Sequence, residues 1–409
     1  MALLVAAGVA GAATYYVDSE IGQDDPSRKG GPGDPWRTIT YALSRVSGEN
    51  TFLCRGTFAE NVDVAYDDNR STFQGNATAH NTGYFCSPYE GRITVKDFDV
   101  NGSVRSAFKG YFLAADCDVS HPTGGAFVMG RFYGRGAAEN CAVQNCKWIC
   151  SAGNWEFGDL DLTDCEFRDC ESGISISGEA TPYLKRCKFF NVGGEVFKAY
   201  FYGEGASFDY CEFYDCSTVI SLTGGPRGYW CSIKNSVFRG NGQVISISKK
   251  AASHNVNIIN NFIFENKGVA ITVGGKNVKL RTNIVKDNDG HGVYITEGAV
   301  DLGTLGDPGG NTFAGNKSGY DVYNASSEDI PAYGNTWDPQ SEAEMEGKTW
   351  QEVNVTRIYD HWDDPSVGYV MWSEPMVGVA PASLGQIKAS FQGEPPSGLL
   401  TPSPSSAVR

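Results

Sequence analysis

The sequence is poor in charge, and its basic residues are outnumbered by acidic ones. Charged residues make up 20% of the 409 residues, and 33 Lys and Arg stand against 48 Asp and Glu, for a formal net charge of −15. Nucleic-acid binding requires clustered basic side chains, so nucleic acid is not an expected partner. The chain also lacks any apolar run of about 18 residues, so we expect no membrane span.

Helix-favouring residues do not dominate either, because the chain contains 50 Gly, which is unfavourable inside helices. Aromatic residues reach 12%, whereas disordered chains are aromatic-poor and rich in charge. The composition therefore predicts an ordered, Gly-rich, all-β protein.

The first thirteen residues, MALLVAAGVAGAA, are apolar and end in small residues. Ala10, Gly11 and Ala12 fit a signal-peptidase cleavage pattern, although the basic residues that usually precede the apolar stretch are missing. We interpret residues 1–13 as a leader, which predicts a protein that is secreted or displayed at the cell surface. The alternative is a retained first strand of an intracellular or virion protein.

A short phrase recurs along the middle of the chain at intervals of roughly two dozen residues. Its first positions are Cys117, Cys141, Cys165, Cys187, Cys211, Ser236, Asn261, Asn283 and Asn311. Five residues after most of them stands a second marker: Cys146, Cys170, Cys216, Asn241, Asn266, Asn288 and Asn316. Repetition at a fixed period indicates a repeat architecture.

Strand-like phrases follow these markers, such as GISISG at 173–178 and VISIS at 244–248. They alternate β-branched with small polar residues, as strands with one buried face do. Repeated short strands without helices predict a single-stranded parallel β-helix of about ten coils. Adjacent coils would lie about 4.8 Å apart, so the Cys, the Asn and the Phe of the repeat would stack in columns.

Changes in this pattern divide the chain. Residues 14–60 are expected to form an N-terminal cap and the first strands, including an amphipathic helix behind Pro35 that covers the first coil. Residues 61–340 form the β-helix, and residues 341–380 form a C-terminal cap with a helical start. Residues 381–409 are a Pro/Ser-rich tail.

The segments YYVDSEIGQDD, DPWRTITYALSRV and CRGTFAENV resemble the opening of the pectin-lyase-like superfamily of right-handed parallel β-helices. They are most similar to bacterial secreted members that begin YYV-D and continue PW-x-TI. The segments around Trp337, Ile358 and Gly368 resemble the end of the same proteins, so the resemblance spans about residues 14–375. It implies a right-handed coil but selects no activity, because lyases, hydrolases, esterases, epimerases, adhesins and phage spikes share this fold.

The twelve Cys lack the spacing of zinc ligands. We interpret them as buried free thiols, with disulfides between coils as the alternative in a secreted protein. Asp-rich loops, at 18–34 and 360–364, could hold Ca²⁺ through oxygen ligands, although EF-hand spacing is missing. We assign no metal site and no other cofactor.

Equivalent turn positions on three successive coils carry Lys267, Asp289 with His291, and Lys317. A lyase needs a base and a cation beside a uronate carboxylate, and these four residues are the candidate catalytic set. The alternative is that they are solvated turn charges. The Gly-His-Gly around His291 resembles a polygalacturonase motif, but the paired aspartates of that family are absent, which argues against a hydrolase.

Hydroxyl side chains dominate the predicted outward face of the second strand phrase. That face carries Ser175, Ser177, Ser221, Thr223, Ser246, Ser248, Thr272, Tyr294 and Thr296. It suits hydrogen bonding to sugars or packing against another copy. Loops beyond the strands carry rings and Arg that could stack on sugars and pair with their acidic groups. These candidate substrate-binding residues are Arg131, Tyr133, Tyr200, Tyr202, Arg227, Tyr229 and Trp230.

We therefore predict a secreted or surface-exposed β-helix that contacts polysaccharide or neighbouring copies without catalysis, as an adhesin or matrix component does. The alternative is a polysaccharide lyase acting on an acidic, uronate-containing glycan. The third hypothesis is a virion spike or an extracellular filament subunit.

Overall fold

The computed structural model describes residues 12–374 apart from a set of short gaps. The gaps are 65–69, 77, 88, 107, 130–132, 153–157, 179, 202–204, 225–229, 250–254 and 318. Nearly all of the predicted leader, the tail, and Arg131, Tyr202, Arg227 and Tyr229 therefore lie outside the described residues, as does the side chain of Tyr200.

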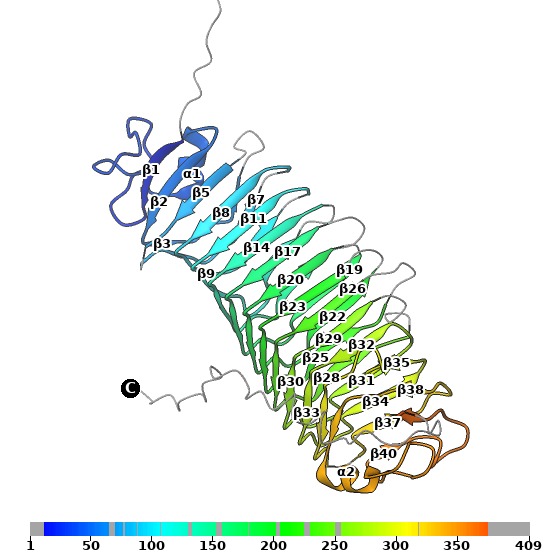
Figure 1. Ribbon diagram of the computed structural model, residues 1–409. Coiled ribbons are helices and arrows are strands. Elements are labelled where there is room, and N and C mark those ends of the chain that lie inside the picture. The colour runs from blue at the N-terminus through cyan, green and yellow to red at the C-terminus, as the bar shows by residue number, and fades with distance from the viewer. Residues whose placement is uncertain are drawn as a thin grey trace, which may run out of the picture. The chain divides into compact units, whose positions relative to one another are not determined.

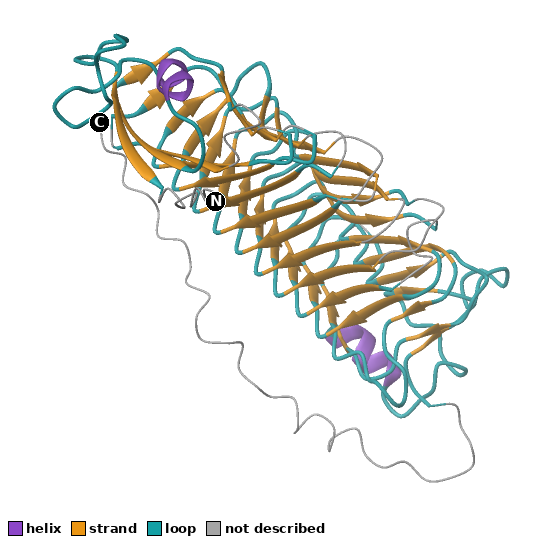
Figure 2. Ribbon diagram, turned by 90° about the horizontal axis from the view of Figure 1, so that it is seen from above, coloured by secondary structure: helices purple, strands orange, loops and turns teal. Residues whose placement is uncertain are grey.

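The described residues form a parallel β-helix in which each coil contributes one strand to each of three sheets (Figures 1 and 2). Each sheet has 13 strands. Sheet 1 comprises β1 (Ala13–Asp18), β2 (Asn50–Arg55), β5 (Arg70–Gln74), β8 (Arg92–Lys96), β11 (Tyr111–Ala115), β14 (Arg135–Glu139), β17 (Asp159–Thr163), β20 (Thr181–Lys185), β23 (Gly205–Asp209), β26 (Trp230–Lys234), β29 (Val256–Ile259), β32 (Val278–Arg281) and β35 (Val300–Asp301).

Sheet 2 holds the shortest strands. It comprises β3 (Thr57–Phe58), β6 (His80–Asn81), β9 (Asp99–Asn101), β12 (Asp118–Ser120), β15 (Ala142–Gln144), β18 (Glu166–Arg168), β21 (Lys188–Phe190), β24 (Glu212–Tyr214), β27 (Val237–Arg239), β30 (Phe262–Phe264), β33 (Ile284–Lys286), β36 (Thr312–Ala314) and β39 (Thr336–Trp337).

Sheet 3 completes each coil. It comprises β4 (Val62–Asp63), β7 (Phe85–Ser87), β10 (Val104–Ser106), β13 (Gly125–Met129), β16 (Trp148–Ala152), β19 (Ile174–Gly178), β22 (Glu195–Phe201), β25 (Thr218–Leu222), β28 (Gln243–Ile247), β31 (Ile271–Gly274), β34 (Val293–Glu297), β37 (Val322–Asn324) and β40 (Ile358–Tyr359). A separate pair joins β38 (Ile330–Pro331) to β41 (Val370–Met371). The predicted all-β solenoid is confirmed, and strands at both ends extend the sheets beyond the Cys/Asn repeat.

Short turns with a left-handed residue lead from sheet 1 to sheet 2 and from sheet 2 to sheet 3. Asn140 (φ 51°) lies between β14 and β15, and Asn145 (φ 54°) lies between β15 and β16. Asn and Asp tolerate this conformation better than other residues with a side chain, which explains their recurrence at these two points. A third connection returns the chain from sheet 3 to sheet 1, and its length varies from two residues between β19 and β20 to eight between β28 and β29.

The predicted interior columns are present. The Cys at the first repeat position, Cys117, Cys141, Cys165, Cys187 and Cys211, are buried and free. The other seven of the 12 Cys are also free, and all of them except Cys86 are buried. Further along, the amide of Asn261 donates to the side chain of Asn283 at 3.0 Å, and Asn283 donates to Asn311 at 2.9 Å. The second column forms the same ladder from Asn241 to Asn316. Cys fills the turn by packing in the earlier coils, and Asn fills it by hydrogen bonding in the later ones.

A column of stacked phenylalanine rings lies inside the coil against sheet 2. The ring centres of Phe167 and Phe189 are 4.7 Å apart, and those of Phe213 lie 5.0 Å from Phe189 and 4.8 Å from Phe238. All four side chains are fully buried. Such rings contribute much of the apolar area that stabilises the coil.

Two short helices lie at opposite ends of the described β-helix (Figure 2). Helix α1 (Ile39–Arg45) begins after Thr38, whose side chain accepts the N–H of Tyr41, and it buries Ile39 and Ala42 against the first coil, as predicted. Helix α2 (Pro339–Met345) begins after Asp338 in the same way. Within the described part of the chain, neither helix has the length and apolar character that crossing a membrane requires.

Candidate functional site

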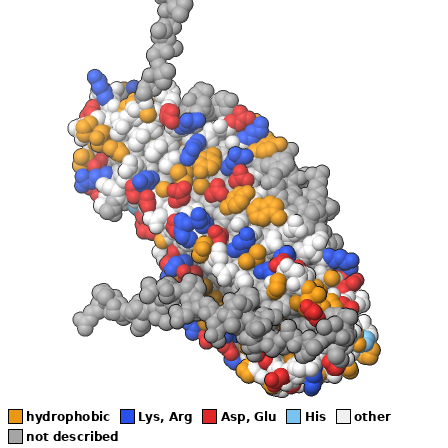
Figure 3. All heavy atoms as spheres, in the orientation of Figure 1, with side chains coloured by type: hydrophobic (Ala, Val, Ile, Leu, Met, Phe, Trp, Pro, Cys, Tyr) orange, Lys and Arg blue, Asp and Glu red, His pale blue; other side chains and the backbone are white. Residues whose placement is uncertain are grey.

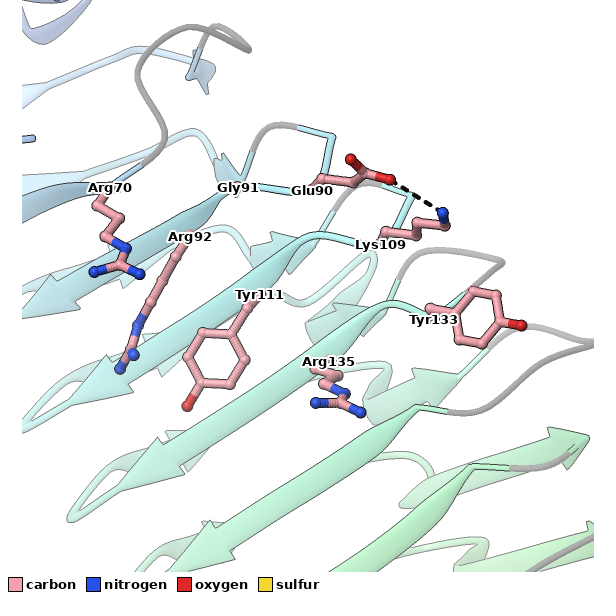
Figure 4. A pocket seen from close by; sticks show the side chains of 8 residues that line it. All are labelled: Arg70, Glu90, Gly91, Arg92, Lys109, Tyr111, Tyr133 and Arg135. Carbon is pink, nitrogen blue, oxygen red and sulfur yellow. Dashed lines mark hydrogen bonds and ion pairs between the residues drawn. The ribbon is translucent and has the colours of Figure 1, made fainter. Parts of the chain in front are cut away.

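A column of basic and aromatic side chains runs along the outer face of sheet 1. Arg70, Arg92, Tyr111 and Arg135 are the first residues of β5, β8, β11 and β14, and they are direct partners in the sheet register. Alternation along a strand points all four to the outside, and adjacent strands lie about 4.8 Å apart. Figure 4 shows the four side chains on successive strands.

These residues line a hollow of about 810 Å³ on the surface. Its wall is formed by Arg70, Glu90, Gly91, Arg92, Lys109, Tyr111, Tyr133 and Arg135. Four of the lining side chains are basic and one is acidic, in a chain of net charge −15. The acid, Glu90, already pairs with Lys109 at 3.0 Å (Figure 4). The hollow is therefore a positive site on an acidic protein.

The three guanidinium groups have little competition from carboxylates. Arg70 lies 3.9 Å from Glu49, and Arg135 lies 3.4 Å from Asp159, and both pairs are exposed to solvent. Exposed pairs of this kind contribute little and exchange readily. Arg92 makes no ion pair within the described residues. A guanidinium can bind carboxylate or sulfate through two parallel hydrogen bonds, so the column can bind acidic groups.

Acidic residues stand beside the basic column on the next coil. Burial raises the pKa of Asp161, Asp159 and Glu139 raise it further, and Arg135 opposes them. Burial also raises the pKa of Tyr111, and the guanidinium of Arg92 opposes that rise. Asp161, although still exposed, therefore takes up a proton more readily than an aspartate free in water, and Tyr111 keeps its hydroxyl proton at neutral pH.

Two exposed rings continue this face toward the C-terminal coils. Tyr183 is the register partner of Asp161, and its ring lies 6.2 Å from that of Trp230, the first residue of β26. The two residues are 40% and 38% exposed. Figure 3 shows hydrophobic, basic and acidic side chains interspersed on the side of the molecule where the sheet 1 strands are labelled in Figure 1. Rings and fixed charges thus share one elongated surface.

Of the predicted substrate-binding residues, Tyr133 lines the hollow and Trp230 lies farther along the same face. Tyr200 belongs to β22 in sheet 3. The sequence interpretation missed Arg70, Arg92 and Tyr111, which precede the first Cys marker. The sequence does contain a pattern that could have identified them. The strand segments RSTFQ, RITVK and YFLAA each begin with a large polar or aromatic residue, followed by alternating residues.

The predicted catalytic residues Lys267, Asp289 and Lys317 do occupy equivalent positions. The backbone N–H of each donates to the ladder asparagine of the preceding coil. Their side chains separate, because Lys317 pairs with Asp289 at 3.2 Å while Lys267 lies 3.9 Å from Asp215. All of these side chains are more than half exposed.

His291 belongs to a different environment. Its Nδ1 accepts the backbone N–H of Tyr320 at 3.0 Å, and its ring lies among tyrosine rings. Burial lowers the pKa of His291. Within the described residues no hydrogen bond or ion pair joins it to Lys267, Asp289 or Lys317. The structure therefore brings together one pair of the predicted set and leaves the other two residues apart from it.

The carboxylates of the Asp-rich loops accept hydrogen bonds from backbone N–H groups. Asp18 accepts the N–H groups of two following residues, Asp24 accepts those of Arg37 and Thr38, and Asp360 accepts that of Val370. Among the described residues no group of three His, Cys, Asp or Glu side chains is placed to hold a metal ion. The geometry thus gives these aspartates a role in fixing loops.

Two family models match parts of this chain. Residues 117–277 match the family described as the right-handed β-helix region, and residues 227–342 match a family described as a protein of unknown function, DUF1565. A solved structure named rhamnogalacturonan lyase is similar, with a TM-score of 0.35 and 13% identity over 94% of this chain and 93% of that chain. No curated protein matches the sequence. The three-sheet coil and the match over residues 117–277 agree with the right-handed parallel β-helix that the terminal motifs implied.

Proposed function

We propose that the protein binds an acidic polysaccharide along the outer face of sheet 1, with the hollow around Arg92 as the anion-binding site. The observation that carries this proposal is the column of Arg70, Arg92 and Arg135, with Tyr111 between them, in a chain of net charge −15. Binding without turnover, as in a secreted adhesin or matrix component, is the simplest role for such a surface.

The spacing of the column supports a glycan that runs along the axis of the coil. Arg92 and Arg135 are two strands apart, which corresponds to about 9.6 Å. That distance is comparable to the length of a disaccharide, so alternate sugars of an extended chain would present their acidic groups to both guanidiniums. The rings of Tyr111 and Tyr133 could stack on the sugar faces between them. Tyr183 and Trp230 would contact later sugars of the same chain.

The test is a combined Arg92→Ala and Arg135→Ala variant against a matched Arg239→Ala control, whose arginine is exposed on sheet 2 and pairs with Glu265. Calorimetric titration with oligogalacturonate and oligoalginate should show binding to the wild type and a loss of about tenfold or more in the double variant. The control should bind like the wild type. Absence of wild-type binding to every acidic glycan would refute the function, and an unaffected double variant would refute the site.

A lyase acting on a uronate glycan is the second candidate, favoured by the raised pKa of Asp161 beside Arg135. In such a reaction a base takes the proton from the carbon next to the carboxylate, and the electrons of that bond form a carbon–carbon double bond to the neighbouring carbon. The glycosidic oxygen on that neighbour leaves with the electrons of its own bond and takes up a proton. The Arg column would hold the carboxylate during this step. Ultraviolet absorption of the unsaturated product detects this reaction. If the sheet 1 site is the active site, Asp161→Asn abolishes the product and Lys267→Ala does not. The opposite result assigns the reaction to the turn residues Lys267, Asp289, His291 and Lys317.

Contact with neighbouring copies, as in a filament or a virion spike, is the third candidate. It is supported by the register of Ser221, Ser246 and Thr272 in one outward column of sheet 3. Sedimentation over a range of protein concentrations tests it, because a Ser246→Arg variant should weaken any association through this column. N-terminal sequencing of the natural protein tests secretion through removal of the leader.

A further inference from the structure

The outer face of sheet 3 ends in a group of aromatic rings at the C-terminal end of the coil. Tyr294 in β34, Tyr323 in β37 and Tyr359 in β40 are register partners in one outward column. These strands are neighbours in Figure 1. His291 and Tyr320 precede β34 and β37 and place their rings beside the column. We call these five residues the tyrosine platform.

Tyr323 lies at the centre of the platform. Its ring centre is 4.1 Å from that of Tyr359, and the two planes are parallel within 1°. The rings of His291, Tyr294 and Tyr320 lie 4.9, 5.2 and 5.4 Å from it. All five side chains are half-buried, so each packs on its neighbours and still reaches the surface. The rings therefore hold one another in a fixed arrangement.

The platform is uncharged at neutral pH. Nδ1 of His291 accepts a hydrogen bond from the backbone, which places the ring proton on Nε2. Burial lowers the pKa of His291, so the imidazole stays neutral. Tyrosine hydroxyls are neutral in this range and serve as donors and acceptors. The nearest charges of the predicted catalytic set, Lys317 and Asp289, pair with each other.

Polar groups continue the platform in two directions. On the preceding coils the same outward column carries Ser221, Ser246 and Thr272. Beyond the platform lies a surface hollow of about 620 Å³, lined by Thr296 of β34, residues 325–328 after β37, and the charged side chains of Lys249, Lys276 and Glu297. Lys249 and Glu297 pair with each other at 2.7 Å. Hydroxyl groups and a polar hollow thus flank a set of rings that contains no Lys or Arg and whose one imidazole, His291, is neutral.

We propose that the tyrosine platform is a second glycan site, specific for uncharged sugar rings and separate from the basic hollow on sheet 1. Aromatic faces stack on the apolar C–H faces of sugars. The hydroxyls of the column and the Nε2–H of His291 would bond sugar hydroxyls. A carboxylate would find no cation among the rings, so acidic sugars are disfavoured. The proposal is independent of the acidic-glycan function of sheet 1.

Calorimetric titration of the full chain with neutral hexasaccharides (cellohexaose, mannohexaose and xylohexaose) tests it, with oligogalacturonate as the acidic probe. At least one neutral sugar should bind, and Tyr323→Ala should weaken that binding by about tenfold or more, because the variant loses the central ring of the platform. Tyr210→Ala, an exposed tyrosine outside both sites, is the matched control and should bind normally. Arg92→Ala should leave neutral-sugar binding unchanged.

The assignment is overturned if no neutral hexasaccharide binds at millimolar concentration, or if binding survives Tyr323→Ala intact. If Tyr323→Ala does not fold, as judged by circular dichroism, Tyr294→Ala at the outward position replaces it with the same expectation. A dimer that disappears in Tyr323→Ala, without any sugar binding, would assign the platform to self-association and also overturn the proposal. A variant that loses oligogalacturonate binding but keeps neutral-sugar binding has lost the sheet 1 site and retains the platform.

Discussion

The guanidinium carbon of Arg92 lies 4.5 Å from the centre of the Tyr111 ring on the neighbouring strand of sheet 1. A ring face attracts the cation without occupying its N–H donors. The contrast is Arg281 on the same sheet, whose guanidinium is bound by Asp301 at 2.7 Å and by Asp307 at 2.9 Å. One arginine is committed to holding a loop, whereas Arg92 is positioned with its donors available to an anion.

Binding of an acidic glycan should therefore depend on salt and on Arg92. We expect affinity to fall as ionic strength rises, because salt screens exposed charges. Arg92→Ala should lower the affinity for the acidic glycan about tenfold, which corresponds to the loss of one charge-assisted hydrogen bond. The affinity of the variant should also change less with ionic strength. Arg92→Lys keeps the charge but loses the planar fork, so its affinity should fall between the two. Titration calorimetry at low and high salt measures both effects, and an unchanged salt dependence in Arg92→Ala would contradict them.

The asparagine ladder should be a main source of stability. Asn266 is fully buried, donates to Asn288 at 2.8 Å and accepts from Asn241 at 3.0 Å. Asn266→Ala leaves buried partners unsatisfied and should lower the free energy of unfolding by about 2–4 kcal/mol. Asn257→Ala, at a half-buried position on sheet 1, is the matched control and should cost about 0.5 kcal/mol or less. Chemical denaturation compares the two, and similar losses in both would argue against the ladder.

The fold could be predicted because its determinants are periodic. Cys187 and Asn283 occupy the same turn of different coils, and a fixed spacing in the sequence requires that such positions stack. The left-handed turn residues and the alternation of Ile with Ser carry the same period. Every inward column follows from that spacing alone.

The binding surface could be predicted only in part, because outward side chains are free of the constraint that packing imposes. Arg92 and Tyr111 precede the Cys markers, so their shared column emerges only from the strand register. The equivalent turn positions of Lys267 and Asp289 follow from the repeat, but the directions of their side chains do not, because Lys267 extends toward Asp215 on an earlier coil while Asp289 pairs with Lys317. The sequence pattern does not determine the rotamer of a side chain at an exposed turn.

The fully buried thiols of Cys150 and Cys231 should be chemically inert in the folded protein. Burial raises the pKa of Cys150 and of Cys231 to about 12, and that of the less buried Cys86 to about 11. Only the thiolate reacts with alkylating agents, so we expect negligible labelling of these three Cys by iodoacetamide at neutral pH and full labelling after unfolding. Mass spectrometry of peptides counts the modified sites. Rapid labelling of Cys150 in the folded protein would contradict the packing described for the coil.

Asp321 closes the second asparagine ladder. Its Oδ1 accepts the side-chain N–H of Asn316 at 2.6 Å and lies 3.3 Å from the guanidinium of Arg357. Burial nevertheless raises the pKa of Asp321 above its ordinary value of 3.8, because desolvation outweighs these two partners. The folded state therefore binds a proton at this carboxyl more tightly than the unfolded state does.

The sign of the pH effect follows from this difference. The stabilising contribution of the protonated form is complete below the unfolded pKa and is lost as pH rises through the higher folded pKa. Asp321→Asn removes this titration while keeping an oxygen for Asn316, and Arg357 retains Asp338 at 3.3 Å. Relative to the variant, the wild type should lose about 1.4 kcal/mol of unfolding free energy for each unit by which the pKa is raised, as pH increases from about 4 to 7. Denaturation curves at several pH values measure the difference, in which the other carboxyls cancel. Parallel pH profiles for the two proteins would mean that Arg357 and Asn316 fully compensate the burial of Asp321.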